Sequence, residues 1–240
     1  MLSKYGVGLD RIDLEAAKEF GIAVTNVPGI NQVSVSEHVL ALLFAFSKNI
    51  HLQYNSVQAG SWKREIGSEI QGKTLGIIGL GAVGKELGKK AGALGMNVLA
   101  FDIFKDQEFL DKYSEINFTT DIDDIYSKCD VISLHLPHTK QTDKLINDIV
   151  INTKLKKQPI IINTARGGIV NENDLHAFLV KNPEAFAAFD VYAEEPALKN
   201  PLLSLPNFFG TSHRSSLTNE GINSMGMAAI NGLDDNIHIT

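Results

Sequence analysis

The chain contains only one cysteine, Cys129, in 240 residues. A single thiol excludes an internal disulfide framework and a cysteine-rich metal site, so no metal is expected. Long apolar runs are also missing. The longest, Val39 to Phe46, is far too short to span a bilayer, and no basic segment followed by an apolar stretch opens the chain. We therefore expect a cytoplasmic protein without a membrane partner.

Long basic runs are absent as well, and the net charge is −6. This argues against nucleic-acid binding as the main role. The chain is 44% hydrophobic and 21% charged, which is ordinary for a globular protein with a sizeable core. One large domain or two small ones would fit this length.

From Gly72 to about Thr211, short β-rich runs alternate with helical stretches. This alternation predicts an α/β fold with a doubly wound parallel sheet. Helices are expected from Val83 to Leu94, closed by Gly95, and from Glu172 to Val180, capped by Asn171. The expected strands lie near residues 74–78, 97–101, 116–119, 130–135, 159–163, 186–190 and 207–210.

A glycine-rich turn follows the first of these strands, with the spacing Gly79-x-Gly81-x-x-Gly84. Gly79 permits the bend, Gly81 lets the backbone approach a pyrophosphate, and Gly84 lets the next helix pack closely. The spacing alone also fits a bend with no ligand. Asp102, at the end of the next strand, lies where a carboxylate binds an adenosine ribose, and this favours a Rossmann fold that binds NAD.

The first seventy residues contain fewer predicted elements and do not continue this alternation of strands and helices. A helix from Asp13 to Phe20 precedes a strand from Ile22 to Asn26, and Ser34-Val-Ser-Glu37 has capping-box spacing before a long helix. So few elements cannot close a core of their own. The segment is packed against the larger domain, shared with another subunit, or the tail of a domain whose beginning is absent.

Three side chains with complementary chemistry follow predicted strands: Arg166, Glu195 and His213. Ligands of open parallel sheets bind beyond the carboxyl ends of the strands, so all three should face the dinucleotide crevice. A guanidinium grips a carboxylate, an imidazole exchanges protons near neutral pH, and a carboxylate orients that imidazole.

These features together resemble the D-isomer-specific 2-hydroxyacid dehydrogenases, and the likeness covers essentially the whole chain. The intervals between the three reactive residues are those of the phosphoglycerate branch. The matching segments are the glycine turn with Asp102, Tyr5-Gly-Val-Gly-Leu-Asp-Arg-Ile-Asp-Leu-Glu-Ala-Ala17, Ser36-Glu-His38, Asn163-Thr-Ala-Arg-Gly-Gly168, Asp190-Val-Tyr-Ala-Glu-Glu-Pro196 and Thr211-Ser-His213.

The resemblance implies a role for each matching residue. Arg166 would bind the substrate carboxylate with the backbone of Val7 and Gly8, His213 would take the C2 hydroxyl proton, and Glu195 would hold His213. NAD would contact Gly79, Gly81, Ala82, Val83, Gly84, Asp102, Leu136, Thr164, Ala165, Arg166, Asp190, His213 and Ser215. The family also implies a homodimer formed through residues 34–66.

The chain departs from the family pattern mainly in length, since it starts near the end of a flavodoxin-like substrate domain. That domain would lack on the order of 60 to 70 residues. The expected divisions are a substrate-domain remnant (1–33), an interdomain helix and dimerisation arm (34–71), the NAD-binding Rossmann domain (72–212) and a C-terminal helix (213–240). Arg214 could add positive charge near a phosphorylated or dicarboxylic substrate.

Three functions remain open at this point. The first is NAD-dependent oxidoreduction of a small D-2-hydroxy acid, with D-3-phosphoglycerate dehydrogenase as the specific alternative. The second is a shortened chain that binds dinucleotide without turnover. A dinucleotide-sensing repressor has little support, because no basic recognition helix is evident.

Overall fold

The computed structural model describes residues 1–234, which fold around a parallel sheet of seven strands. The strand order β5-β4-β3-β6-β7-β8-β9 reverses between β3 and β6, as in the Rossmann fold, and confirms that prediction. Each expected strand is present within one residue of its predicted bounds. They are β3 (Thr74–Ile78), β4 (Asn97–Phe101), β5 (Ile116–Thr119), β6 (Val131–Leu134), β7 (Ile160–Asn163), β8 (Phe186–Phe189) and β9 (Phe208–Gly210).

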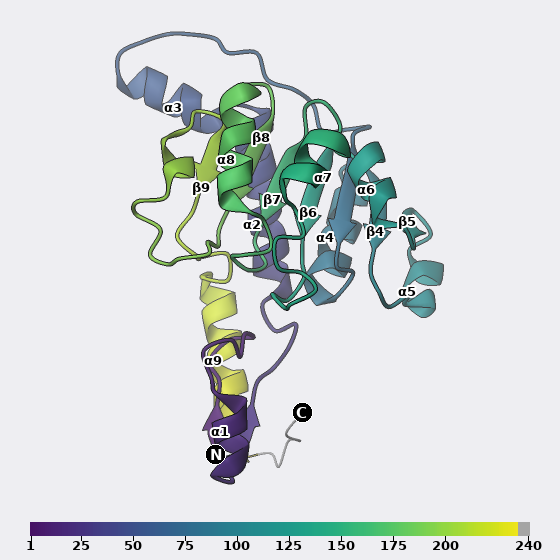
Figure 1. Cartoon of the computed structure of the whole chain (residues 1–240), viewed down its shortest axis with the longest axis vertical. Coiled ribbons are helices and arrows are strands. Elements are labelled where there is room, and N and C mark those ends of the chain that lie inside the picture. The colour runs from purple at the N-terminus through teal and green to yellow at the C-terminus, as the bar shows by residue number, and fades with distance from the viewer. Residues whose placement is uncertain (235–240) are drawn as a thin grey trace.

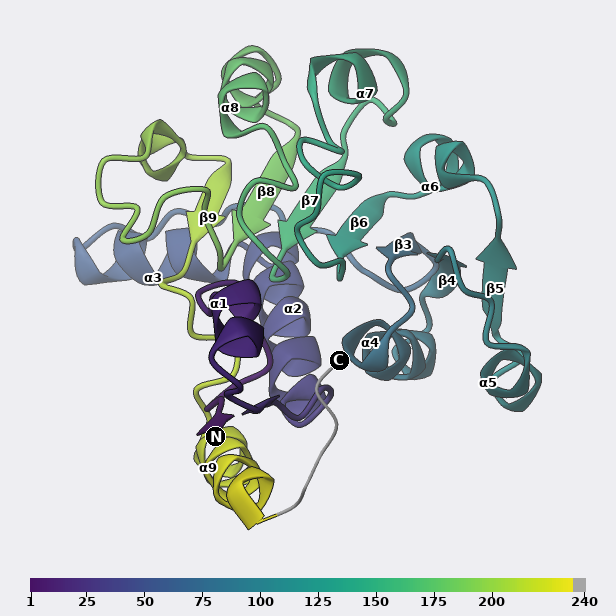
Figure 2. The same cartoon turned by 60° about the horizontal axis from the view of Figure 1, so that its bottom comes forward.

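Helices cover both faces of this sheet (Figure 2). One face carries α2 (Gln32–Ser47), α4 (Ala82–Ala93) and α5 (Gln107–Lys112), and the other carries α6 (Ile122–Lys128), α7 (Asp148–Thr153) and α8 (Glu172–Lys181). The central strands are therefore buried on both sides, which explains their uninterrupted apolar runs. A 3-10 turn, η1 (Pro201–Ser204), lies between β8 and β9.

The helix ends show where local sequence rules held and where they failed. Gly95 follows α4 with a φ of +79°, and the Asn171 side chain caps α8, both as predicted. The prediction that a capping box at Ser34 starts the long helix was wrong, because α2 already begins at Gln32. The Ser34 hydroxyl instead lies 2.8 Å from Thr218 Oγ1, so a tertiary contact uses the group that was expected to cap the helix.

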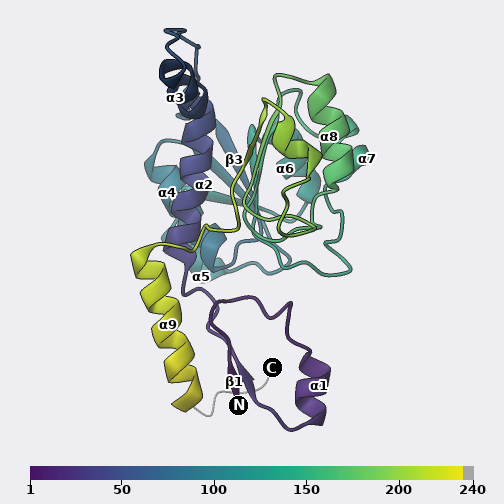
Figure 3. The same cartoon turned by 90° about the vertical axis from the view of Figure 1, so that its left-hand side faces the viewer.

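A small second body lies beyond the carboxyl end of the sheet (Figures 1 and 3). In it, β1 (Leu2–Ser3) pairs in parallel with β2 (Val24–Thr25), α1 (Leu14–Glu19) lies between them in sequence, and α9 (Asn219–Asp234) packs on both strands. The predicted strand from Ile22 to Asn26 is only two residues long, as is its neighbour. The predicted C-terminal helix starts at Asn219, and residues 235–240 lie outside the described residues.

The apolar run from Val39 to Phe46 belongs mainly to the core, since Val39, Leu42 and Leu43 are buried. Beyond it, α3 (Ile50–Gln58) and residues 59–69 extend past the end of the sheet that lies opposite the small second body (Figure 1). Within the described part of the chain, no helix combines the length and the apolarity needed to cross a bilayer.

Candidate active site

The glycine turn between β3 and α4 has three glycines with different local roles. A Cβ at Gly79 would lie 2.5 Å from the His135 carbonyl oxygen, and one at Gly84 would lie 2.1 Å from the Gly79 oxygen. A Cβ at Gly81 would meet nothing within 4 Å. Gly79 and Gly84 are therefore required by the protein's own packing, whereas Gly81 leaves open space at the start of α4, where a phosphate would meet the helix N-terminus.

Asp102 closes this turn from the end of β4. Its Oδ2 accepts a hydrogen bond from the Leu80 backbone N–H (2.6 Å), and its Oδ1 accepts one from the Phe104 N–H (2.9 Å). Because a carboxylate has further acceptor positions, both oxygens can still accept from ribose hydroxyls. The predicted ribose carboxylate is thus held rigidly beside the glycine turn.

Other predicted cofactor residues line the carboxyl ends of the neighbouring strands. Leu136, after β6, lies against Gly79, and Ala82 and Val83 form the first turn of α4. After β7, Thr164 and Ala165 are buried, and the Thr164 hydroxyl has no hydrogen-bond partner among the described residues. An open glycine turn, a fixed carboxylate after β4 and a buried hydroxyl without a partner after β7, all at the carboxyl ends of one sheet, fit a bound dinucleotide.

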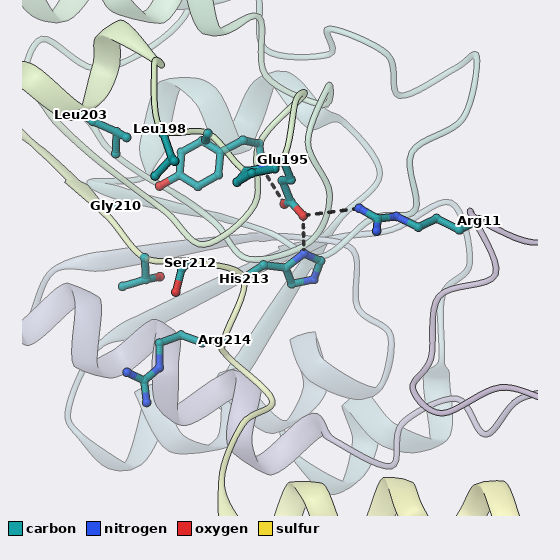
Figure 4. Close-up of a pocket in the computed structure, with 12 residues that line it drawn as sticks. Arg11, Glu195, Leu198, Leu203, Gly210, Ser212, His213 and Arg214 are labelled. Atoms are coloured by element: carbon teal, nitrogen blue, oxygen red, sulfur yellow. Dashed lines mark hydrogen bonds and ion pairs between the residues drawn. The ribbon is translucent and has the colours of Figure 1, made fainter.

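His213 and Glu195 form a hydrogen-bonded pair beyond β9 and β8 (Figure 4). The His213 Nδ1 lies 2.8 Å from Glu195 Oε2, and Glu195 Oε1 accepts from the Tyr192 N–H at 3.1 Å. A carboxylate only accepts hydrogen bonds, so Nδ1 carries the proton and the lone pair is on Nε2. His213 also has a φ of +51°, a conformation that costs energy for a non-glycine residue and is typical of functional sites.

Arg166 lies at the turn after β7, at the same carboxyl end of the sheet as this pair. Its Nε donates to Asp10 Oδ2 at 2.9 Å, and its Nη1 donates to the Ala165 carbonyl at 2.7 Å. The Asn163 side chain donates to the Arg166 carbonyl and so shapes the turn. A Cβ at Gly8 would lie 2.3 Å from Arg166 Nη2 and 2.6 Å from Asp10 Oδ2, so a larger residue here would displace these two side-chain ends from their present contact.

The predicted substrate and catalytic residues share one cavity of about 600 Å³. Val7, Gly8, Arg166, Glu195 and His213 all line it. The structure therefore brings these five residues together from the small second body and from the ends of three adjacent strands of the sheet. Among the described residues, no group of His, Cys, Asp and Glu side chains is arranged to hold a metal ion.

Asp190 holds the loop that carries His213. Its fully buried carboxylate accepts from Thr211 Oγ1 (2.5 Å), the Arg214 N–H (2.9 Å) and the Ser215 N–H (2.8 Å). His38 on α2 contacts Thr211 Oγ1 from the other side at 3.1 Å. Burial lowers the pKa of His38, and the Asp190 carboxylate opposes that shift.

The sequence patterns did not single out two of the groups that contact the catalytic residues. Asp10 pairs with Arg166, and Arg11 approaches Glu195. Both lie within the segment that resembles the family, but nothing in their local sequence indicates contacts with residues more than 150 positions away. Arg214, considered as a substrate contact, points away from His213 and Glu195 (Figure 4).

Comparisons with known proteins identify the family of the chain. Residues 40–215 match the family model described as "D-isomer specific 2-hydroxyacid dehydrogenase, NAD binding domain". Because that match covers well over half of the chain, the protein belongs to the D-isomer-specific 2-hydroxyacid dehydrogenases and contains their NAD-binding domain.

Individual relatives carry different substrate names. The chain is 42% identical to D-3-phosphoglycerate dehydrogenase of Archaeoglobus fulgidus over 95% of its own length, but spans only 43% of that protein. It is 37% identical to hydroxypyruvate reductase of Thermotoga maritima, with 96% of this chain and 75% of that protein covered. The D-lactate dehydrogenase of Aquifex aeolicus, solved with NAD and lactic acid, superimposes with a TM-score of 0.86 at 28% identity, covering 96% of this chain and 74% of that one.

Proposed function

We propose that this chain carries the active site of an oxidoreductase that moves a hydride between NAD(H) and C2 of a small D-2-hydroxy acid or 2-oxoacid. The observation that carries the proposal is the His213–Glu195 pair facing the same cavity as Arg166. Base, orienting carboxylate and carboxylate-binding cation are the groups that this oxidation needs.

In the direction of oxidation, Arg166 binds the substrate carboxylate and draws electron density from the C2 oxygen. The lone pair on His213 Nε2 takes the proton of the C2 hydroxyl, and Glu195 stabilises the imidazolium through Nδ1. A dinucleotide held by the glycine turn and Asp102 would supply the acceptor for the hydride of C2. The C2–O bond becomes a carbonyl, so the products are a 2-oxoacid, a reduced cofactor and a protonated His213.

The binding of the substrate carboxylate requires a rearrangement of one ion pair. Arg166 now contacts Asp10, whose side chain is 53% exposed. Exposed ion pairs contribute little free energy, so a substrate carboxylate that binds in bidentate fashion can displace Asp10. Asp10 therefore occupies the guanidinium in the free protein and gives way when a substrate carboxylate binds.

The test is replacement of His213 by asparagine, which tolerates a positive φ and keeps the loop geometry. We expect His213→Asn to lower kcat by about 10²- to 10⁴-fold for the best 2-oxoacid, because the proton transfer is lost. NADH affinity, measured by fluorescence titration, should change little. His176→Asn, the same replacement on α8, is the matched control and should leave kcat unchanged.

The alternative function, dinucleotide binding without turnover, makes a different prediction. NADH would bind and be displaced by NAD, but no 2-oxoacid among glyoxylate, pyruvate, hydroxypyruvate and 3-phosphohydroxypyruvate would oxidise it.

If His213→Asn instead abolished NADH binding and left residual turnover in proportion to bound cofactor, the catalytic role of His213 would be wrong. The same panel decides whether the enzyme is a D-3-phosphoglycerate dehydrogenase specifically.

We also propose that the chain forms a homodimer through the arm formed by α3 and residues 59–69, and that it acts in the cytoplasm. Tyr54 (64% exposed), Trp62 (77%) and Ile66 (95%) are the apolar side chains that favour this arm as an interface. Trp62→Glu with Ile66→Glu should give a monomer by sedimentation equilibrium. Val180→Glu, at an exposed apolar position on α8, should leave the dimer intact.

A further inference from the structure

The segment that joins β9 to α9 carries His213, and α2 holds this segment at both ends (Figure 3). At its start, the Thr211 Oγ1 lies 3.1 Å from His38 Nε2. At its end, the Thr218 Oγ1 lies 2.8 Å from the Ser34 hydroxyl. Ser34 and His38 lie one turn apart on the same face of α2. A single helix therefore fixes the two positions between which His213 must lie.

The proton of the Thr211 hydroxyl decides the direction of the His38 contact. The other hydrogen-bond partners of Thr211 Oγ1 among the described residues are Asp190 Oδ1 at 2.5 Å and the Phe189 carbonyl at 3.5 Å. Both are oxygens that only accept, so the single hydroxyl proton goes to the nearer one, the carboxylate. Thr211 Oγ1 can then only accept from His38. His38 Nε2 must therefore carry a proton.

The surroundings of the His38 ring indicate that this is its only proton near neutral pH. Burial lowers the pKa of His38; the Asp190 carboxylate, 3.7 Å from Nε2, opposes that shift, and the charge of Arg214 adds to it. The neutral imidazole donates from Nε2 to Thr211, and Thr211 donates to Asp190. The contact is thus a relay of two hydrogen bonds.

Asp190 connects this relay to the catalytic histidine. Its Oδ1 accepts from Thr211 and from the Arg214 N–H, and its Oδ2 accepts from the Ser215 N–H. The carboxylate therefore binds the chain on both sides of His213, whose φ of +51° is costly and persists only where the surroundings fix it. A carboxylate that rotated would release one of these sides. The relay keeps Oδ1 directed toward Thr211.

We propose that His38 is a positioning residue for His213. It acts through the Thr211 hydroxyl, which it directs onto Asp190. The loop is thereby kept in the conformation that brings His213 to Glu195. This inference rests on the proposed function, in which the last two residues are the catalytic pair. Loss of the Nε2–H donor should leave the fold in place and loosen the loop.

The experiment compares a variant that keeps a donor with one that loses it. The side-chain amide of His38→Gln can donate to Thr211, whereas His38→Leu fills similar space without a donor. We expect His38→Leu to lower kcat for the best 2-oxoacid near neutral pH by about 3- to 10-fold, and His38→Gln by less than about twofold. NADH affinity should change by less than about twofold in both. His176→Gln, on α8, is the matched control and should leave kcat unchanged.

A second variant tests whether the donor acts through the hydroxyl. Thr211→Val should lower kcat about as much as His38→Leu, and the double variant should lose no more than either single one. Equal losses in His38→Gln and His38→Leu would mean that the ring only fills space. Additive losses in the double variant would mean that His38 acts without Thr211. An unchanged kcat in His38→Leu would show that the ring plays no part.

The tautomer of each ring gives a readout that needs no turnover, and long-range proton–nitrogen NMR spectra of histidine side chains distinguish the two tautomers. We expect Nε2–H for His38 and Nδ1–H for His213, assigned from the signals missing in His38→Gln and His213→Asn. In Thr211→Val, His213 should change from one tautomer to a mixture, because it leaves Glu195 part of the time.

These spectra also decide the inference if His38→Leu does not fold. If wild type reduces none of the 2-oxoacids, the proposed function fails separately, and the spectra of wild type and Thr211→Val still test the relay. The expected tautomers and their change would support it. An Nδ1–H tautomer for His38, or an unchanged His213 signal in Thr211→Val, would overturn it.

Discussion

Replacing Asp190 by asparagine should destabilise the protein and displace His213 together. The wild-type carboxylate accepts three hydrogen bonds, two on Oδ1 and one on Oδ2, and it is 0% exposed. An asparagine has one accepting oxygen, and its NH₂ group donates. Whichever way the amide is oriented, the NH₂ group faces at least one backbone N–H, from Arg214 or from Ser215.

The expected magnitude follows from that mismatch. Each buried donor left without an acceptor costs about 1 to 3 kcal/mol, and the loss of charge weakens the bonds that remain. We therefore expect Asp190→Asn to lower the free energy of unfolding by about 2 to 4 kcal/mol. For a chain of this size, each kcal/mol lowers Tm by about 2 to 4 °C.

Urea titration of the free protein, monitored by circular dichroism, measures the loss of unfolding free energy. The rate of NADH oxidation at saturating 2-oxoacid reports whether His213 is displaced. Asp111→Asn is the matched control, because Asp111 is exposed on α5 and accepts only from Gln107. It should change stability by less than about 0.5 kcal/mol. If Asp190→Asn were as stable as this control and lost only NADH affinity, Asp190 would contact the cofactor, as the family resemblance implies, rather than support the loop.

The remaining predictions concern the glycine turn and the partly buried imidazole of His135. Gly84→Ala should lower the free energy of unfolding by about 2 kcal/mol or more, since its Cβ would meet the Gly79 carbonyl oxygen. Gly81→Ala, whose Cβ would meet no atom, should lower the free energy of unfolding by less than about 1 kcal/mol and mainly weaken NADH binding. Comparable losses of stability in the two variants would contradict this assignment. Burial lowers the pKa of His135, which contacts Ser133 Oγ at 2.9 Å, to about 4. Because the unfolded state binds the proton at about pH 6.5, the stability that His135 contributes is complete above that pH and is lost as the pH falls toward 4, by about 2 kcal/mol at pH 5. His135→Gln should therefore flatten the urea-midpoint profile between pH 7.5 and 5, and parallel profiles would show that another group is responsible.

The strands of the sheet could be predicted because a buried strand is a continuous run of apolar residues in the sequence. The run from Ile160 to Asn163 is buried on both faces, so its apolar character is continuous and its ends are visible. Short-range caps such as Asn171 were predictable for the same reason. The start of α2 was not, because Thr218, far along the chain, takes the Ser34 hydroxyl that local spacing assigned to a cap.

The features of the candidate site likewise separate into those that local sequence predicts and those that it does not. The glycine turn with Asp102 could be recognised from spacing, because backbone geometry near a phosphate requires glycine. Nothing local indicates that Asp10 contacts Arg166 or that Arg11 contacts Glu195. These contacts arise only when the small second body is placed against the carboxyl end of the sheet, and no periodicity or motif encodes that placement.

The convergence of the catalytic residues follows from strand order more than from their individual identities. Arg166, Glu195 and His213 follow β7, β8 and β9, which are adjacent and parallel, so their carboxyl ends must lie side by side at one edge. Given this adjacency, Asp190 at the end of β8 is the natural anchor for the loop after β9, and it accepts three hydrogen bonds from it. The loop can then hold His213 at a positive φ, because the neighbouring strand supplies the stabilisation that the strained residue lacks.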